Sequence, residues 1–277
     1  MRRSLAVVLL FTAASAGCGG SSHQRVDPER MLDDAARHPI SSAQVEVDAH
    51  LQVLGIERLS TPLRLRFDGP YSSGGGRRIP SFDWRVGVGA LGFTVGGRAV
   101  STGENVYLSI YGDDYEVGAA AVAAANRRLG ESSATGQALD VEPRAWFGRA
   151  RVVGDDSAGG TDCERISAPL RGEQVAHDLT PLVQGLGLSA APSVSGTTTA
   201  CIGYDDRVFH ELELDAELGV AVADRARLGG ATGARLNADV VIGDVGKGEP
   251  ISAPGGDFRP IRDLFLTLND LGVPIPL

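Results

Sequence analysis

Cys18 is the residue whose surroundings point most directly to chemistry. Arg2 and Arg3 precede an apolar run from Leu5 to Ala14, and three small residues follow before the cysteine. A charged head, a short apolar core and small residues before a cleavage point are typical of a secretory signal. The apolar core has about ten residues, whereas a membrane-spanning helix needs about twenty. The sequence therefore predicts export and not a membrane span.

A cysteine directly after such a signal can become acylated. The segment resembles a bacterial lipoprotein signal, in which this cysteine becomes the first residue of the mature chain, although Ser15 stands where that motif usually has leucine. The resemblance implies a lipoprotein signal peptide at 1–17, acyl groups such as palmitate on Cys18, and an extracytoplasmic protein anchored to the outer face of the cell membrane. A plain secretory signal is the alternative. Residues 18–27 are mostly small and polar, which predicts a flexible tether before a single domain at 28–277.

Cys163 and Cys201 are the other two cysteines. An even pair in an exported chain favours a disulfide, and two buried thiols are the alternative. Since no histidine or cysteine lies at ligand spacing from either residue, no metal site is expected.

The sequence lacks the common catalytic motifs. The five histidines are scattered, and the sequence has neither an HExxH pair nor a GxSxG elbow. His50 and His210 alternate with strand residues and are predicted to be structural. The acidic pairs at 113–114 and 155–156 are predicted to be solvated turns and not cation sites. We therefore expect that the protein is not an enzyme and binds neither a cofactor nor a metal ion. A secreted hydrolase of unknown type is the alternative.

The charge and composition exclude some partners and favour a fold class. The formal net charge is −9 and no basic run follows the signal, so a nucleic-acid partner is not expected. Aromatic residues are only 5% and glycines number 37, which favours strands and turns over a helical bundle.

Alternation of apolar and polar residues is the main structural signal. It predicts antiparallel strands with one apolar and one polar face at 45–53, 63–67, 82–88, 93–97, 106–110, 151–153, 162–169, 199–204, 208–218 and 236–242. Helices are predicted at 27–37, 119–129, 172–185 and 258–271. Asp68, Gly69 and Pro70 predict a turn, and four acidic residues at 211, 213, 215 and 217 predict a wet face that protects a strand edge. This order predicts an α+β fold: a single large curved antiparallel sheet, a half-open barrel, with helices packed on its concave face.

The order of these elements is familiar. The lipidation signal, the tether and the amphipathic strands are followed by an alanine-rich helix, Ala119 to Leu129. A strand–Gly–strand unit, Val152 to Leu170, then leads into a helix from Gln174 to Leu182, and a hairpin follows from Ile202 to Val208. Together they resemble the LppX/LprG family of actinobacterial lipoproteins, which is related in shape to the LolA and LolB carriers. The resemblance covers roughly residues 30 to 245. It implies a half-open barrel with an apolar cavity for acyl chains, and no catalytic residues.

Only the apolar strand faces can be assigned to such a cavity. The residues predicted to line it are Val47, Leu51, Leu65, Phe82, Trp84, Val86, Phe93, Leu108, Leu212 and Leu214. The same residues would serve equally well in a filled core, and the alternation does not distinguish the two. Glycines at 87, 89, 92, 96 and 97 indicate either strong sheet curvature or close packing beside a helix.

The predicted function is that of a membrane-anchored lipoprotein that binds acyl chains of lipids or glycolipids for transfer or presentation. An envelope sensory or regulatory module, which would bind another protein through the same fold, is the alternative. The expected partners are a lipid or glycolipid ligand and the cell membrane, and the chain is expected to be a monomer.

Overall fold

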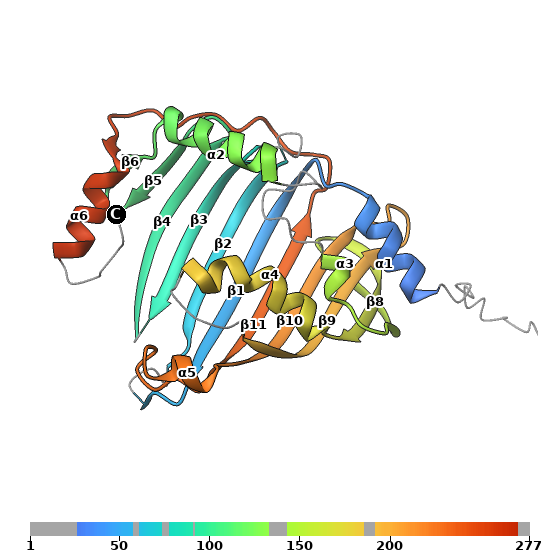
Figure 1. Ribbon diagram of the computed structural model, residues 1–277. Coiled ribbons are helices and arrows are strands. Elements are labelled where there is room, and N and C mark those ends of the chain that lie inside the picture. Colours follow the sequence, from blue (N-terminus) through green and yellow to red (C-terminus); the bar gives the residue numbers. More distant parts are fainter. Residues whose placement is uncertain are drawn as a thin grey trace, which may run out of the picture.

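The computed structural model describes residues 27–57, 61–73, 78–90, 92–132, 143–185 and 192–270, so the predicted signal peptide, Cys18 and nearly all of the tether lie outside the described residues. The helices are α1 (Pro28–Arg37), α2 (Ala119–Ser132), α3 (Pro143–Trp146), α4 (Gly172–Gly185), α5 (Val222–Arg225) and α6 (Ile261–Asp270). The strands are β1 (Ser42–Leu54), β2 (Leu63–Ser72), β3 (Ser81–Ala90), β4 (Phe93–Thr102), β5 (Val106–Ile110), β6 (Asp113–Glu116), β7 (Arg151–Ala158), β8 (Thr161–Pro169), β9 (Ser193–Gly203), β10 (Phe209–Gly219), β11 (Gly233–Gly243) and β12 (Arg259–Pro260) (Figure 1).

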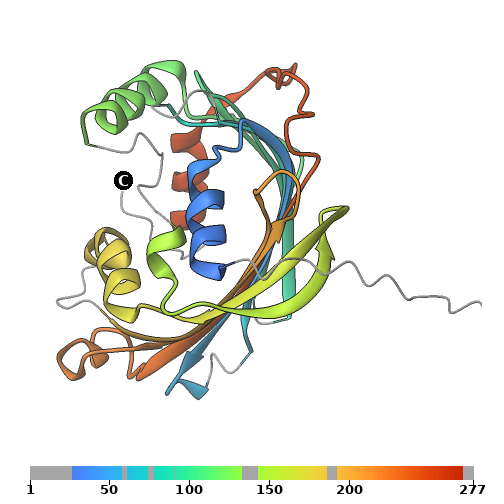
Figure 2. The ribbon, with the colours of Figure 1, turned by 90° about the vertical axis from the view of Figure 1, so that its right-hand side faces the viewer.

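The twelve strands form one sheet, in the order β12-β6-β5-β4-β3-β2-β1-β11-β10-β9-β8-β7. Neighbouring strands are antiparallel except β12, which runs parallel to β6. Figure 2 shows the sheet as a strongly curved wall with helices α1 to α4 on its concave side. The predicted α+β half-open barrel is confirmed.

The strand register separates an apolar face from a charged one. Val47 of β1 lies opposite Phe67 of β2 and Val240 of β11, whereas the next residue, Asp48, lies opposite Arg66 and Asp239. Since successive side chains of a strand point to opposite faces, these sets continue across the sheet. We call the side of Val47 the concave face, because the helices pack on it, and the side of Asp48 the convex face.

Helices α1 and α3 seal the concave face at strands β8 and β9. Met31 and Leu32 of α1 and Phe147, just after α3, are completely buried against Ile166 of β8 and Ile202 of β9. Burial of a side chain of this size contributes about 1.5–3 kcal/mol. This end of the half-barrel is therefore a conventional solid core.

Polar contacts hold these helices together. The Arg144 guanidinium of α3 donates from Nη2 to Glu29 Oε2 and from Nε to Asp33 Oδ1, both at 2.6 Å and both in α1. Trp146 Nε1 donates to Asp178 Oδ2 of α4 at 2.8 Å. The predicted helix at 27–37 thus becomes part of a fixed α1–α3–α4 layer over one side of the sheet.

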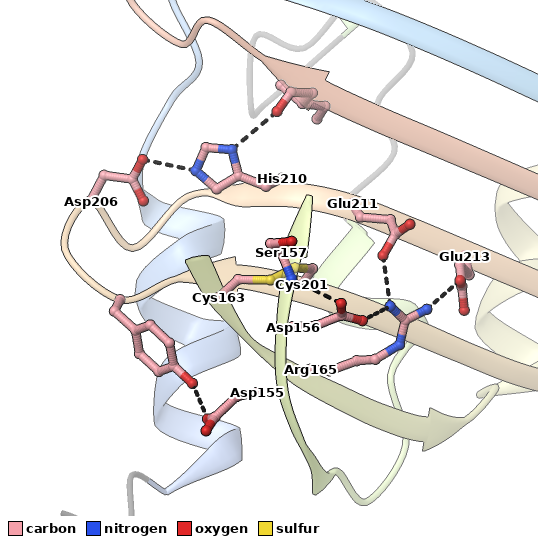
Figure 3. Close-up of a disulfide and its surroundings, with 12 residues drawn as sticks. Asp155, Asp156, Ser157, Cys163, Arg165, Cys201, Asp206, His210, Glu211 and Glu213 are labelled. Carbon is pink, nitrogen blue, oxygen red and sulfur yellow. Dashed lines mark hydrogen bonds and ion pairs between the residues drawn. A yellow bond between two sulfur atoms is a disulfide. The ribbon is translucent and has the colours of Figure 1, made fainter. Parts of the chain in front are cut away.

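The convex face carries ion pairs between neighbouring strands. The cross-strand pairs are Arg98–Asp83, Arg85–Asp68, Arg66–Glu46, Arg64–Asp48 and Arg235–Glu217. Arg165 of β8 contacts three carboxylates, those of Asp156, Glu211 and Glu213 (Figure 3). Such exposed pairs contribute little individually, but they make this face unsuitable for an apolar ligand.

The predicted disulfide is confirmed. Cys163 of β8 and Cys201 of β9 are joined, with their Cα atoms 5.5 Å apart, and both are completely buried on the convex side (Figure 3). Nearby, His210 is 2% exposed, and its ring nitrogens contact Ile242 O at 3.0 Å and Asp206 Oδ2 at 2.8 Å. The prediction that His210 is structural agrees with these contacts.

Some local predictions are wrong. Residues 113–114 and 155–156 lie in strands β6 and β7 and not in turns, because each segment pairs with a neighbouring strand. The acidic stripe of β10 does not protect an edge, since β10 lies between β9 and β11; Glu211 and Glu213 instead pair with Arg165. The role of Glu211 and Glu213 depends on a partner, Arg165, that is distant in sequence.

Candidate functional site: an open apolar face

Strands β2 and β3 lie near the middle of the sheet, yet none of their residues is fully buried. A central strand normally buries its apolar face against another layer, because exposed apolar area is unfavourable in water. Here Val88 is 44% exposed and Leu65 is 40% exposed. The concave face is therefore sealed at β8 and β9 but open at β2 to β4 among the described residues.

The ten residues predicted to line a cavity share the concave face. On β1, β2 and β3 the register places Val47, Phe67 and Val86 side by side, and on β3, β4 and β5 it places Trp84, Ala99 and Leu108 side by side. By strand alternation the others follow: Leu51, Leu65, Phe82, Phe93, Leu212 and Leu214.

Their exposure divides these residues into two groups. Leu212 packs against the core formed with α1, and Val47, at 9% exposed, lies near the boundary of the sealed part. Leu65 is 40% exposed and Phe93 is 78% exposed, so both belong to the open part. Val88 and Val95 extend the open part, although the sequence analysis did not select them; they continue the same alternation along β3 and β4.

Three aromatic rings form the floor of the open part. The ring of Trp84 stacks on Phe82 at a centroid distance of 4.1 Å and on Phe67 at 4.7 Å. Trp84 Nε1 is buried and has no hydrogen-bond partner among the described residues. A buried N–H without an acceptor is uncommon, so this indole occupies a place where an additional acceptor would be favourable.

Helix α2 borders the open part at the ends of β3 and β4 that are farthest from their shared hairpin. Asn126 Oδ1 accepts a hydrogen bond from the Ile79 amide at 2.7 Å, and its Nδ2 donates to Gly103 O at 2.9 Å. Both partners lie in the loops that flank β3 and β4 at their upper ends. Figure 1 shows α2 crossing that end of the sheet while the lower ends of β3 and β4 extend beyond it. The helices thus border the open face instead of filling it.

The convex face contains a different kind of hollow, of about 450 Å³, where β1, β9, β10 and β11 lie side by side. Its lining is polar and includes Asp48, His50, Glu213, Asp215 and Asp239. No group of three or more potential ligand side chains in the described ranges is arranged to hold a metal ion. The hollow is thus unsuited to hydrocarbon.

Asp239 in this hollow gives a prediction of pH-dependent stability. Its Oδ1 is buried without a partner in the described part of the chain, and burial, followed by the nearby Glu213 charge, raises the pKa of its carboxyl group. The ionised form therefore opposes folding at a pH above the folded-state pKa, and the penalty is absent below the usual value of 3.8. Asp239→Asn should raise the melting temperature at pH 7. The gain in the free energy of unfolding should be under about 1 kcal/mol, because the carboxyl group is partly solvated.

Melting curves of the unsubstituted protein and of Asp239→Asn at pH 7 and pH 3 check this prediction, because the gain in stability should vanish at pH 3. Asp215→Asn, on an exposed residue of β10, is the matched control and should change little at either pH. A lower melting temperature for Asp239→Asn at pH 7 would mean that the carboxylate is stabilising instead.

Comparisons with known proteins agree with this architecture. No family model matches the sequence, and no curated protein matches it. Among solved structures, the chain is similar to LprF from Mycobacterium bovis, with a TM-score of 0.50 and 15% identity over 83% of this chain and 97% of that one. The chain has the LppX/LprG-like fold.

Two further solved structures show weaker similarity to the chain. Lipoprotein LppX from Mycobacterium tuberculosis is 11% identical, with a TM-score of 0.43, over 81% of this chain and 98% of that one. A LolA superfamily protein from Nitrosomonas europaea is 10% identical, with a TM-score of 0.23, over 78% and 91% of the two chains. At these identities the similarity to LprF establishes the fold, so the ligand must be argued from the open face itself. In the part of the chain that the structure describes, no helix is both long enough and apolar enough to cross a bilayer.

Proposed function

We propose that this protein binds the acyl chains of a lipid or glycolipid on the open concave face, as a lipoprotein anchored outside the cytoplasm through Cys18. The observation that carries the proposal is the lack of any fully buried residue in β2 and β3, in the middle of the sheet. An alkyl chain laid on this face would gain about 0.8 kcal/mol for each buried CH₂ group. It would also complete the burial that the described helices leave unfinished.

The arrangement of the face suits a lipid better than an enzyme substrate. Its floor is aliphatic and aromatic, and the charged side chains of the same strands, such as Asp48, Arg66 and Asp83, are on the opposite face. Hydrocarbon needs only such a surface and no directional contact.

The predicted anchor fits this role. A single acyl chain holds a protein to a membrane only marginally, whereas two or three chains hold it stably. We propose that residues 1–17 are a signal peptide, that acylated Cys18 provides the chains, and that the tether at 18–27 lets the domain at 28–277 reach lipids of the same membrane. The protein would then transfer or present its ligand as a monomer.

Fluorescence of Trp84 tests the binding directly. The sequence has two tryptophans, so Trp146→Phe leaves Trp84 as the only one. Because Trp84 lies on the floor of the open face, dibrominated stearate should quench its emission in a saturable way, and unbrominated stearate should compete. Trp84→Phe, which leaves Trp146 beside Asp178, is the control and should show little quenching.

Quenching confined to Trp84 supports the proposal, and so does lipid in extracts of the protein from its host. Absence of saturable quenching, together with absence of co-purifying lipid, would refute acyl-chain binding. A co-purifying protein in place of lipid would favour the sensory or regulatory alternative.

A further inference from the structure

The tip of the β3–β4 hairpin carries no charged residue on either of its two strands. Residues 86–97 contain twelve consecutive uncharged residues, between Arg85 and Arg98, which pair with Asp68 and Asp83. On β3 and β4 the convex ladder of ion pairs therefore stops where this tip begins, whereas on the neighbouring strand β2 the paired Arg66 and Arg64 lie opposite Gly87 and Gly89. At about 3.4 Å per residue, β3 continues for roughly 17 Å beyond Arg85.

Neither face of the tip carries a charged side chain of β3 or β4. On the concave face, Phe93 is 78% exposed and Val95 is 36% exposed, and they continue the apolar strip of Val88 and Leu65 outward from the open face. On the convex face lie glycines and Thr94. A Cβ atom added at Gly96 would meet nothing within 4 Å, so this glycine is not required by close packing.

Glycine therefore occurs in the tip for a different reason at each position. Gly97 does make a close approach, since a Cβ atom there would come within 2.7 Å of Ser109 O, and Gly92 has a φ of +84° in the turn. Gly87 and Gly96 face each other on the convex side without helix contact. At these two positions the convex side of the tip has no side chain, which neither the curvature nor the packing interpretation of the sequence anticipated.

The outer backbone edge of the tip is also free. Strand β5 pairs with β4 only at residues 97–101, so no described strand pairs with the outer edge of residues 93–96. An unpaired edge needs water or another donor and acceptor, which excludes burial in the hydrocarbon core but not a position among hydrated lipid head groups. The side chain of Phe93 can enter the apolar boundary from such a position, as apolar groups of interfacial proteins do.

We propose that the tip of the β3–β4 hairpin docks on the surface of a phospholipid bilayer, with Phe93 inserted, and that the strip of Val95, Val88 and Leu65 leads lipid chains from there to the open face. This inference rests on the proposed function. Continuity of the apolar strip with the open face favours a lipid surface over a protein partner. A second copy is disfavoured because the glycines on the convex side offer a partner strand little side-chain surface to pack against.

A fluorescent reporter at the tip tests the docking. Nitrobenzoxadiazole is attached to Thr94→Cys in the full chain with Cys18→Ser, so that Cys163 and Cys201, joined to each other, leave one reactive thiol. Phosphatidylcholine vesicles should shift its emission to the blue, and the shift should persist in high salt because the tip has no charge to screen. The same label at Val153→Cys, an exposed valine of edge strand β7, is the control and should not respond.

Adding Phe93→Asp to the labelled Thr94→Cys chain should weaken the vesicle response at least about tenfold, since the inserted ring is lost. Because Phe93 also belongs to the open part, the affinity of that variant for dibrominated stearate is measured through Trp84 without vesicles. The vesicle response should fall by the larger factor, which separates docking from ligand binding. The docking proposal is overturned if the label at 94 does not shift, if position 153 shifts equally, if Phe93→Asp has no effect, or if the shift appears without vesicles as protein concentration rises, which would indicate a second copy. Absence of Trp84 quenching in the Trp146→Phe protein with Phe93 unchanged, together with absence of co-purifying lipid, would instead refute the proposed function.

Discussion

Val88→Asp should lower the affinity for acyl chains at least about a hundredfold while leaving the fold intact. Val88 is 44% exposed where the open face meets the β3–β4 hairpin, between Leu65 and Val95, so an aspartate there stays hydrated in the empty protein. A bound acyl chain would cover the carboxylate, and burying an unpaired charge costs several kcal/mol. Titration of the Trp146→Phe protein with dibrominated stearate, followed through Trp84, measures the loss.

The chain offers a closely matched control. Val152 of edge strand β7 is 43% exposed, so Val152→Asp makes the same chemical change at nearly the same exposure but away from the open face. It should bind acyl chains like the unsubstituted protein, and both variants should melt within a few degrees of it. Equal affinity for Val88→Asp and Val152→Asp would show that the ligand does not lie on the open face.

The features that could be predicted from sequence are those set by neighbouring residues. Alternation and capping placed most strands and the four longer helices, and helix α4 has the predicted bounds. The failed turn at 68–70 shows the limit of this approach. Gly69 and Pro70 lie inside β2, where Pro70 pairs with Gln44 of β1 while the ladder to β3 omits both residues.

The conformation at Gly69 explains why a turn signal is compatible with a strand. Its φ is +149°, and a Cβ atom there would come within 2.1 Å of Asp83 O, so only glycine allows β3 to approach so closely. Proline is tolerated because the missing N–H falls where the ladder is already interrupted. Both reasons require knowledge of β1 and β3, which are remote in sequence from this segment.

Whether the concave face is open could not be predicted for a related reason. Alternation in β3 is the same under a helix and under a ligand, so Val88 and Ile166 have equivalent sequence patterns but very different exposure. The difference depends on where the helices are fixed, through contacts such as Asn126 with Gly103 and Arg144 with Glu29. Each of these contacts joins residues more than twenty positions apart.

Loss of the disulfide should be the largest effect on stability. With Cys163 and Cys201 separated by 38 residues, the chain-entropy model gives a stabilisation of about 4 kcal/mol. Both cysteines are completely buried and pack with Ala158 of the β7–β8 hairpin. The double variant Cys163→Ala/Cys201→Ala should therefore unfold at clearly lower denaturant concentration and melt about 8–16 °C lower.

The same variant separates stability from ligand binding. The disulfide lies on the convex side of β8 and β9, whereas the ligand is proposed to lie on the concave side of β2 to β4, so the folded fraction of the variant should bind dibrominated stearate with unchanged affinity at low temperature. Reduction of the unsubstituted protein should reproduce the lower melting temperature, and Cys18→Ser, which keeps the bridge, should not. A loss of less than about 1 kcal/mol in the double variant would mean that the unfolded chain is already compact around these cysteines, because the entropic gain from the cross-link would then be small.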